Sequence, residues 1–349
     1  MIRHVFLFFS LLVSNARYIR EPIRCWMRIR LTINVRGCMT KYKKRKFISG
    51  EFMHVYQRTV RGVNIFYDRE DFLLFYTVFA VVAKLYDEAV VELCLMIDRV
   101  HILLSSHSLD DISAFVRHYT SLFVKEYNIG IGRHGQLFYK SFGSAPKKGS
   151  KKIRSAIVYV GNNPVEKSIC KEAREYRWNF LAYISDKHPF SVHKPLNRCS
   201  EKLRRAVREV RKSNEAGHYL SYAQIRRLMD GLQKEDKERL TDHIINIYWP
   251  FDDKTLLSFY ENSEEMFHAM KSTSGAEHDI RETYYSGSDT IYRDMIRVVM
   301  NKCGIIPARL VTQKPSWLKL EVASVLRQTT LATPVQISKF LHMQIGRAE

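Results

Sequence analysis

The chain has 349 residues, of which 46% are hydrophobic and 26% charged, so it can hold two or three domains and a sizeable core. This composition excludes a wholly disordered protein. Six cysteines lie far apart and form no Cys-x-x-Cys pair, which argues against a zinc ribbon or a disulfide scaffold. Such cysteine usage is typical of reduced thiols, so we expect a cytoplasmic protein.

The net charge of +20 favours a nucleic-acid partner. More than half of the excess lies in residues 1–50, which contain 12 Lys and Arg residues against a single Glu. Local basic clusters in the rest of the chain therefore carry more weight than the total charge.

Residues 5–13 are apolar apart from Ser10, follow Arg3 and precede a Ser-Asn-Ala sequence, a pattern that imitates a secretory signal. Nine residues are too few to span a membrane as a helix. The alternatives are a strand, or translation from an early start codon with Met39 or Met53 as the true start. We expect residues 1–50 to be a basic extension and the protein to have no membrane segment.

From residue 51 onward the apolar spacing alternates between the periods of strands and helices. Strands are predicted at 52–60, 89–96, 100–105 and 136–142, and helices at 68–86, 108–127 and 147–163. Ser108 is the expected N-cap of the second helix. The order β-α-β-β-α-β predicts an α+β domain at 51–195, with a ferredoxin-like antiparallel sheet and a further helix after it.

Residues 196–349 have charged helical patterns and no strand runs, so we expect a helical accessory region. Ser221 and Gln224 have the spacing of a capping box. The segment 317–349 resembles the first two helices of a helix-turn-helix, at 317–328 and 334–343, whose third helix would begin near Gly346. Two packing helices are the alternative.

Tyr159 lies in the sequence Tyr-Val-Gly-Asn-Asn-Pro, with Asn163 one helical turn later. A phenolate can attack a phosphate, and an amide at that spacing can reach a metal ion. The alternative is a tyrosine that only packs.

Arg99 and His101 fall on one face of the predicted strand, inside an otherwise apolar run. Buried polar groups are costly unless they are satisfied, so the presence of this pair needs a reason. The alternative is a hydrogen-bonded core histidine beside an arginine in a turn.

A cluster of cations precedes Tyr159 without an intervening acid. Its members are Lys140, Lys147, Lys148, Lys151, Lys152 and Arg154. Such a cluster suits the phosphate backbone of single-stranded DNA, although a charge run is also typical of a solvated face.

Five separated motifs occur in an order that resembles the REP-associated tyrosine transposases, single-tyrosine members of the HUH endonuclease superfamily. The likeness covers about residues 52–185. The motifs begin at His54, Phe66, Met96, Tyr159 and Glu175, and they include Val100-His101, Asn163-Pro164 and Trp178.

The resemblance implies a domain that cuts single-stranded DNA beside a hairpin, with Tyr159 forming a 5′-phosphotyrosine. It also implies Mg²⁺ or Mn²⁺ held by two histidines and a polar residue. His101 matches the second histidine and Asn163 the third ligand, whereas the first histidine falls on Arg99. Family members occur as monomers and dimers, so a homodimer is possible.

Arg99 departs from the family pattern, because a guanidinium does not ligate a divalent cation and is always charged. Three outcomes follow: Arg99 stabilises the phosphate in place of a metal, a rearranged site that includes His54 binds metal weakly, or cleavage is lost. We expect impaired cleavage with retained binding of hairpin DNA in the nucleoid. The alternative is a non-catalytic nucleic-acid-binding or regulatory protein that retains the fold.

Overall fold

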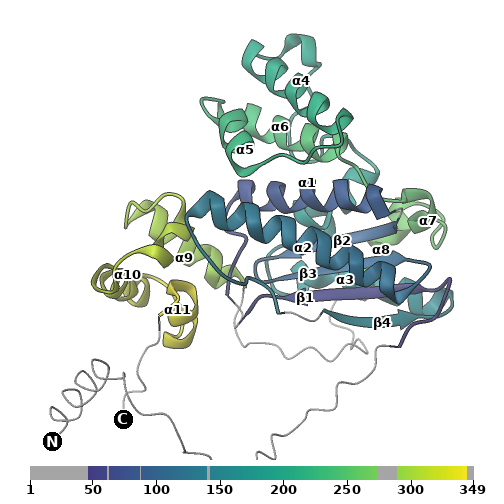
Figure 1. Cartoon of the computed structure of the whole chain (residues 1–349), viewed down its shortest axis with the longest axis horizontal. Helices are drawn as coiled ribbons and strands as arrows, with labels where there is room; N and C mark the ends of the chain where they lie inside the picture. The colour runs from purple at the N-terminus through teal and green to yellow at the C-terminus, as the bar shows by residue number, and fades with distance from the viewer. Residues whose placement is uncertain (1–45, 61–62, 87, 140–141, 274–288, 344–349) are drawn as a thin grey trace, which may run out of the picture. The chain divides into compact units, whose positions relative to one another are not determined.

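The computed structural model describes residues 46–60, 63–86, 88–139, 142–273 and 289–343 (Figure 1). The signal-like segment 5–13, Met39 and Lys140 lie outside the described residues, as does the position near Gly346. In the part of the chain that is described, no helix combines the length and apolar content needed to cross a membrane.

Four strands form one antiparallel sheet: β1 (Phe52–Arg58), β2 (Ala89–Met96), β3 (Arg99–Ser105) and β4 (Gly143–Lys147). Their order in the sheet is β2-β3-β1-β4. Helix α1 (Arg69–Tyr86) connects β1 to β2, and helix α2 (Leu109–Ile131) connects β3 to β4. This arrangement confirms the predicted α+β class and the ferredoxin-like element order.

The predicted position of the fourth strand is wrong, because β4 begins where the expected strand at 136–142 ends. Leu137, Phe138 and Phe142 are buried in the main core, so their apolar pattern reflects packing. The real strand has the sequence Gly-Ser-Ala-Pro-Lys, which carries no strand pattern. Its proline is tolerated because β4 is an edge strand.

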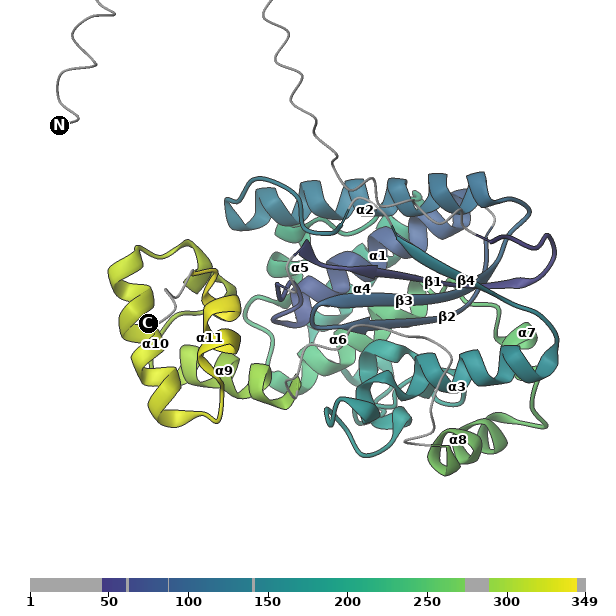
Figure 2. The same cartoon turned by 90° about the horizontal axis from the view of Figure 1, so that it is seen from below.

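Helices cover both faces of the sheet (Figure 2). α1 and α2 lie on one face, and α3 (Ser150–Glu166) lies on the other. Ser108 caps α2 as predicted, accepting a hydrogen bond of 3.0 Å from the backbone N–H of Asp111. α2 continues past the predicted end to Gly132, whose φ of 63° gives a left-handed C-cap.

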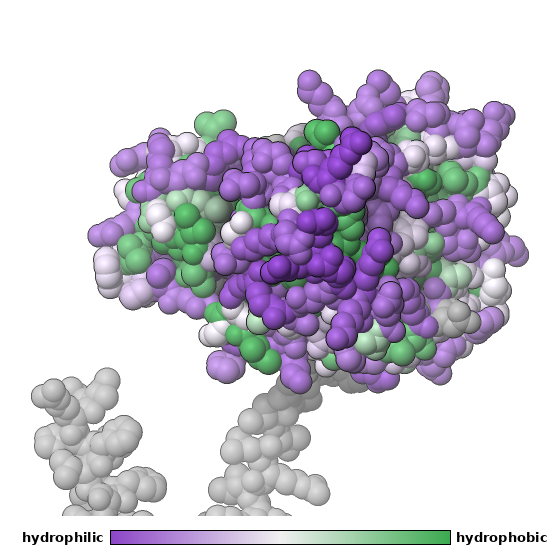
Figure 3. Space-filling model, turned by 90° about the horizontal axis from the view of Figure 1, so that it is seen from above, coloured by the Kyte–Doolittle hydropathy of each residue, from purple (hydrophilic) through white to green (hydrophobic). Residues whose placement is uncertain are grey.

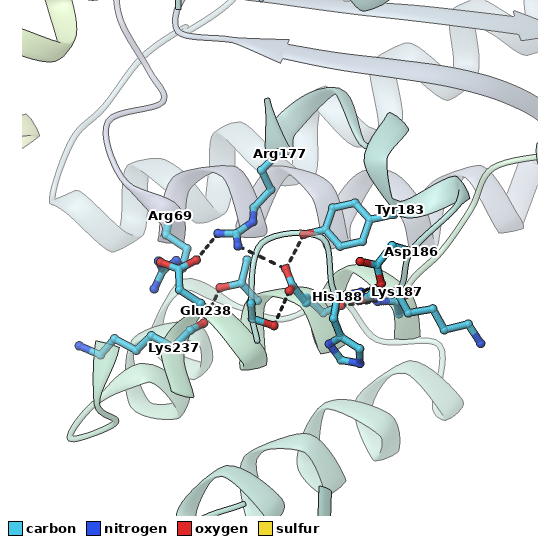
Figure 4. Close-up of polar contacts among 12 residues, drawn as sticks. Arg69, Arg177, Tyr183, Asp186, Lys187, His188, Lys237 and Glu238 are labelled. Atoms are coloured by element: carbon cyan, nitrogen blue, oxygen red, sulfur yellow. Dashed lines mark hydrogen bonds and ion pairs between the residues drawn. The ribbon is translucent and has the colours of Figure 1, made fainter. Parts of the chain in front are cut away.

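The segment after α3 forms short 3₁₀ turns, including η2 (Ala173–Glu175), η3 (Arg177–Asn179) and η4 (Leu181–Ile184). Trp178 stacks on Phe72 of α1 with ring centroids 4.4 Å apart. Figure 4 shows Arg177 and Tyr183 meeting helix α6 (Lys234–Ile247), where the Tyr183 hydroxyl donates to Asp242 at 2.6 Å. The Trp178–Tyr183 motif therefore packs the domain against the C-terminal helices.

Helices α4 (Glu201–Glu215), α5 (Tyr222–Met229), α6 (Lys234–Ile247), α7 (Asp253–Leu257) and α8 (Ser263–Ser272) follow. The Ser221–Gln224 capping box is present as predicted. The main core contains residues from β1 to Tyr248, on both sides of the domain boundary predicted at residue 195. The division into two domains at that residue remains a prediction. Hydrophilic side chains crowd the outer face of these helices around α4 (Figure 3).

The last helices are α9 (Asp289–Asn301), α10 (Ser316–Thr329) and α11 (Pro334–Leu341), with the 3₁₀ turn η6 (Ala308–Gln313) between the first two. They enclose a separate buried cluster that includes Met295, Val322 and Ile337. α10 and α11 match the two predicted segments. The third helix of the group is α9, which precedes them in the chain.

Candidate functional site

The sheet face beneath α3 carries the predicted site. Tyr56 lies opposite His101 in the β1–β3 register, and Arg58 lies opposite Arg99. Side chains alternate along a strand, so His54, Tyr56, Arg99 and His101 all point to this face. Tyr159 reaches it from the middle of α3, which packs over β2 and β3.

Tyr159 meets two imidazoles. Its ring centroid lies 5.9 Å from that of His101 and 5.6 Å from that of His54, both in edge-on geometry. Nε2 of His54 lies 3.1 Å from Nδ1 of His101, within hydrogen-bond distance. The fold thus brings together the predicted residues Tyr159 and His101, and it adds His54 as a direct neighbour of both.

This cluster is enclosed by the protein. Tyr159 is 1% exposed, and His54 and His101 are 0% exposed. Burial, followed by the positive charges of Arg99 and Arg58, holds the pKa of His101 well below its usual value. His101 is therefore a neutral imidazole near pH 7, able to donate one hydrogen bond and accept another.

Arg99 directs its guanidinium at a neighbouring carboxylate. Its Nε donates to Oδ1 of Asp98 at 2.8 Å, and its Nη2 donates to Oδ2 at 3.2 Å. Arg99 is only 5% exposed, so this paired contact with Asp98 is mostly shielded from water. Strand alternation alone would put Asp98 on the opposite face of the sheet; instead it lies in the turn before β3 and folds back onto Arg99.

Asn163 occupies the expected position one turn after Tyr159. Its amide Nδ2 donates 2.9 Å to the backbone carbonyl of Tyr159, and the residue is 1% exposed. That bond is local to α3 and orients the amide along the helix.

The residues present do not fit a Mg²⁺ or Mn²⁺ site in this arrangement. Across the residues that the structure describes, no three His, Cys, Asp or Glu side chains gather in a way that would hold a metal ion. His54 and His101 are directed at one another, and Arg99 at Asp98. Binding of a divalent ion therefore remains a prediction from the family resemblance.

The described members of the basic cluster lie in three different surroundings. Lys148, Lys151 and Lys152 are exposed around the start of α3, whose N-terminal end also favours anions. Lys147 is half-buried in β4. Arg154 is tied to other elements: it donates 2.8 Å to Glu265 of α8 and 3.0 Å to the carbonyl of Phe259, and it lies over the Tyr260 ring.

Tyr56 belongs to this site although the sequence motifs do not single it out. Its ring lies over Gly143 of β4, where any Cβ atom would overlap it, and its centroid is 6.5 Å from that of His101. Tyr56 could have been found from the sequence because it lies two residues after His54 on β1, so both side chains point to the same face. This places Tyr56 beside His101 once β1 is known to pair with β3.

The geometry defines an α+β protein with a tyrosine and a histidine pair enclosed between a helix and a sheet. No protein-family model matches the chain, and no curated protein matches it. Among solved structures, a REP-associated tyrosine transposase bound to a REP hairpin is similar at 15% identity, over 42% of this chain and 87% of that chain. Its TM-score of 0.36 marks a weak, fold-level similarity on which no functional argument rests.

Proposed function

We propose that this protein is a transposase-like protein that binds hairpin-flanked single-stranded DNA, with little strand cleavage through Tyr159. The observation that carries the proposal is the contact of the Tyr159 ring with His54 and His101 on the sheet face beneath α3. The ordered sequence motifs place the same three residues in one family pattern.

Binding is supported by the exposed lysines at the start of α3. Lys151 precedes Tyr159 by eight residues, or about 12 Å along a helix. The three lysines present exposed ammonium groups near a helix N-terminus, which suits the phosphates of a flexible strand. The net charge of +20 supports the same class of partner.

Impaired cleavage is supported by the burial of Tyr159 and by the contact that Arg99 makes with Asp98. Attack on a phosphate needs the phenol oxygen within about 3–3.5 Å of phosphorus, and Tyr159 is 1% exposed. Arg99, which would have to stabilise the phosphate if no metal does, already binds Asp98. Of the three outcomes that Arg99 leaves open, these contacts favour lost cleavage.

The test uses a single-stranded oligonucleotide with a hairpin, and its fully paired duplex as the control. Fluorescence anisotropy should show tighter binding of the hairpin strand. Incubation with Mg²⁺ should give little or no covalent protein–DNA product on a denaturing gel, and Tyr159→Phe should bind as the wild type does. Equal affinity for the duplex would contradict the binding proposal, and a covalent product that Tyr159→Phe abolishes would contradict impaired cleavage.

A second candidate function is that of a DNA-binding regulator. Helix α9 completes a three-helix group with α10 and α11, and α11 begins with the capping box of Thr333 and Gln336. A helix-turn-helix arrangement would read duplex DNA. Preference for a duplex over the hairpin strand, abolished when residues 289–349 are removed, would favour this function.

A further inference from the structure

A groove of about 580 Å³ lies on the side of the sheet opposite Tyr159, between α2 on one side and residues 136–139 with Phe142 on the other. Gln57, which follows Tyr56 on β1 and points the other way, lies at its base. The remaining lining residues are Ser113, Val116, Arg117, Thr120, Ser121, Val124, Lys125, Gln136, Leu137, Phe138, Tyr139 and Phe142.

The walls combine apolar and aromatic side chains with a fixed amide. Phe138 and Phe142 are buried, whereas Tyr139 is 48% exposed at the rim. Gln57 is 4% exposed, and its amide is held in place because Oε1 accepts 2.6 Å from the Tyr119 hydroxyl and Nε2 donates 3.1 Å to Thr120. An aromatic ring beside oriented polar groups suits a planar heterocycle.

The rim is positively charged. Arg117 and Lys125 are exposed on α2 and lie eight residues, or about 12 Å, apart. Among the described residues that line the groove, none is acidic. The groove therefore suits a ligand that joins a planar ring to an anionic group.

We propose that this groove binds one base of single-stranded DNA, with Arg117 and Lys125 contacting the phosphates on either side of it. The inference rests on the proposed function and adds a second contact surface to it. β4 runs along the sheet edge from Gly143 to Lys147, and its five residues span about 17 Å. A DNA strand that follows this edge reaches Lys148, Lys151 and Lys152 without passing Tyr159.

The experiment scans an abasic site through the hairpin oligonucleotide and measures affinity by fluorescence anisotropy. For the wild type, an abasic site at one position of the strand should lower the affinity about tenfold, which is the effect expected for the loss of one stacked base. Tyr139→Ala should lower the affinity for the intact strand by a similar factor and make that position insensitive. Tyr139→Phe should keep the effect, because stacking needs the ring and not the hydroxyl. Leu85→Ala, at another exposed apolar residue, is the control and should change nothing.

The contribution of the charged rim to DNA binding can be measured separately from that of Tyr139. Arg117→Ala with Lys125→Ala should lower the slope of log affinity against log salt by about 0.7 for each phosphate that the protein no longer neutralises. If the wild type binds the strand but no abasic position depends on Tyr139, the groove proposal is wrong and the proposed function stands. If the wild type does not bind single-stranded DNA, both fail together.

Discussion

His54 and His101 lie in nearly parallel planes, 5° apart, with Nε2 of one 3.1 Å from Nδ1 of the other. One nitrogen of the pair must donate a proton and the other must accept it. Protonation of the accepting ring at that nitrogen breaks the bond and places a charge in a site that excludes water. Burial therefore favours the neutral form of His101, whose pKa lies well below its usual value, and this neutrality is linked to folding.

The first prediction concerns pH. The folded-state pKa of His101 lies well below the unfolded value of about 6.5, so the unfolded chain binds more protons as the pH falls below 6.5. The contribution to stability is complete above that value and is lost as the pH drops toward the folded pKa. From pH 7.5 to 5.5 the free energy of unfolding should fall by about 1 kcal/mol more in the wild type than in His101→Gln. Urea unfolding at several pH values measures this difference, and equal pH dependence in the two proteins would contradict it.

The second prediction concerns Arg309, which is buried between α1 and α5. It forms ion pairs with Asp68 and Asp71 and lies 4.8 Å over the Tyr222 ring. Arg309→Ala leaves the buried Asp71 and the partly buried Asp68 without their cation, so it should lower the free energy of unfolding by about 3–5 kcal/mol. Arg327→Ala, at an exposed site on α10, should change it by less than about 0.5 kcal/mol. Similar thermal midpoints for both variants would show that the ion pairs do not join the C-terminal helices to α1.

The third prediction separates the exposed lysines of the basic cluster from Arg154. Alanine at Lys148, Lys151 and Lys152 should weaken binding of the hairpin strand and lower its salt slope by about 0.7 for each phosphate left without a lysine partner. Arg154→Ala should leave the slope unchanged, because Arg154 is tied to Glu265 and Phe259. A slope unaffected by the lysines would assign them to a solvated face.

Much of this arrangement could be predicted from the sequence, because the period of two along β1 and β3 fixes which side chains share a face. The position of His101 and the element order followed from that pattern. β4 could not be predicted, since its pairing comes from its neighbour β1 and not from its own residues. Contacts of Arg99 with Asp98 and of Asn163 with its own helix also depend on rotamers that a motif does not specify.

The fourth prediction tests how β4 shapes the site. A Cβ at position 143 would overlap the Tyr56 ring, so Gly143→Ala must displace either that ring or the strand. We expect a loss of about 1–3 kcal/mol in the free energy of unfolding. Tyr56→Ala in the same chain removes the overlap and should make the alanine at 143 nearly neutral. Additive losses in the double variant, measured by urea unfolding, would show that the two residues do not compete for space.

The last prediction concerns Arg99, the position that departs from the family pattern. Arg99→His removes a permanent cation and adds a third imidazole on the same face as His54 and His101. We expect this variant to bind Mn²⁺ more tightly than the wild type by calorimetry, and to form more covalent product with the hairpin strand. Tyr159→Phe in that background should abolish the product and keep the metal affinity, since only the phenol oxygen can attack.

Gain of metal affinity without product would mean that the enclosure of Tyr159, and not position 99, prevents cleavage. If the unaltered protein cleaves as fast with a chelator as with Mg²⁺, Arg99 replaces the metal and the expectation of lost cleavage is wrong.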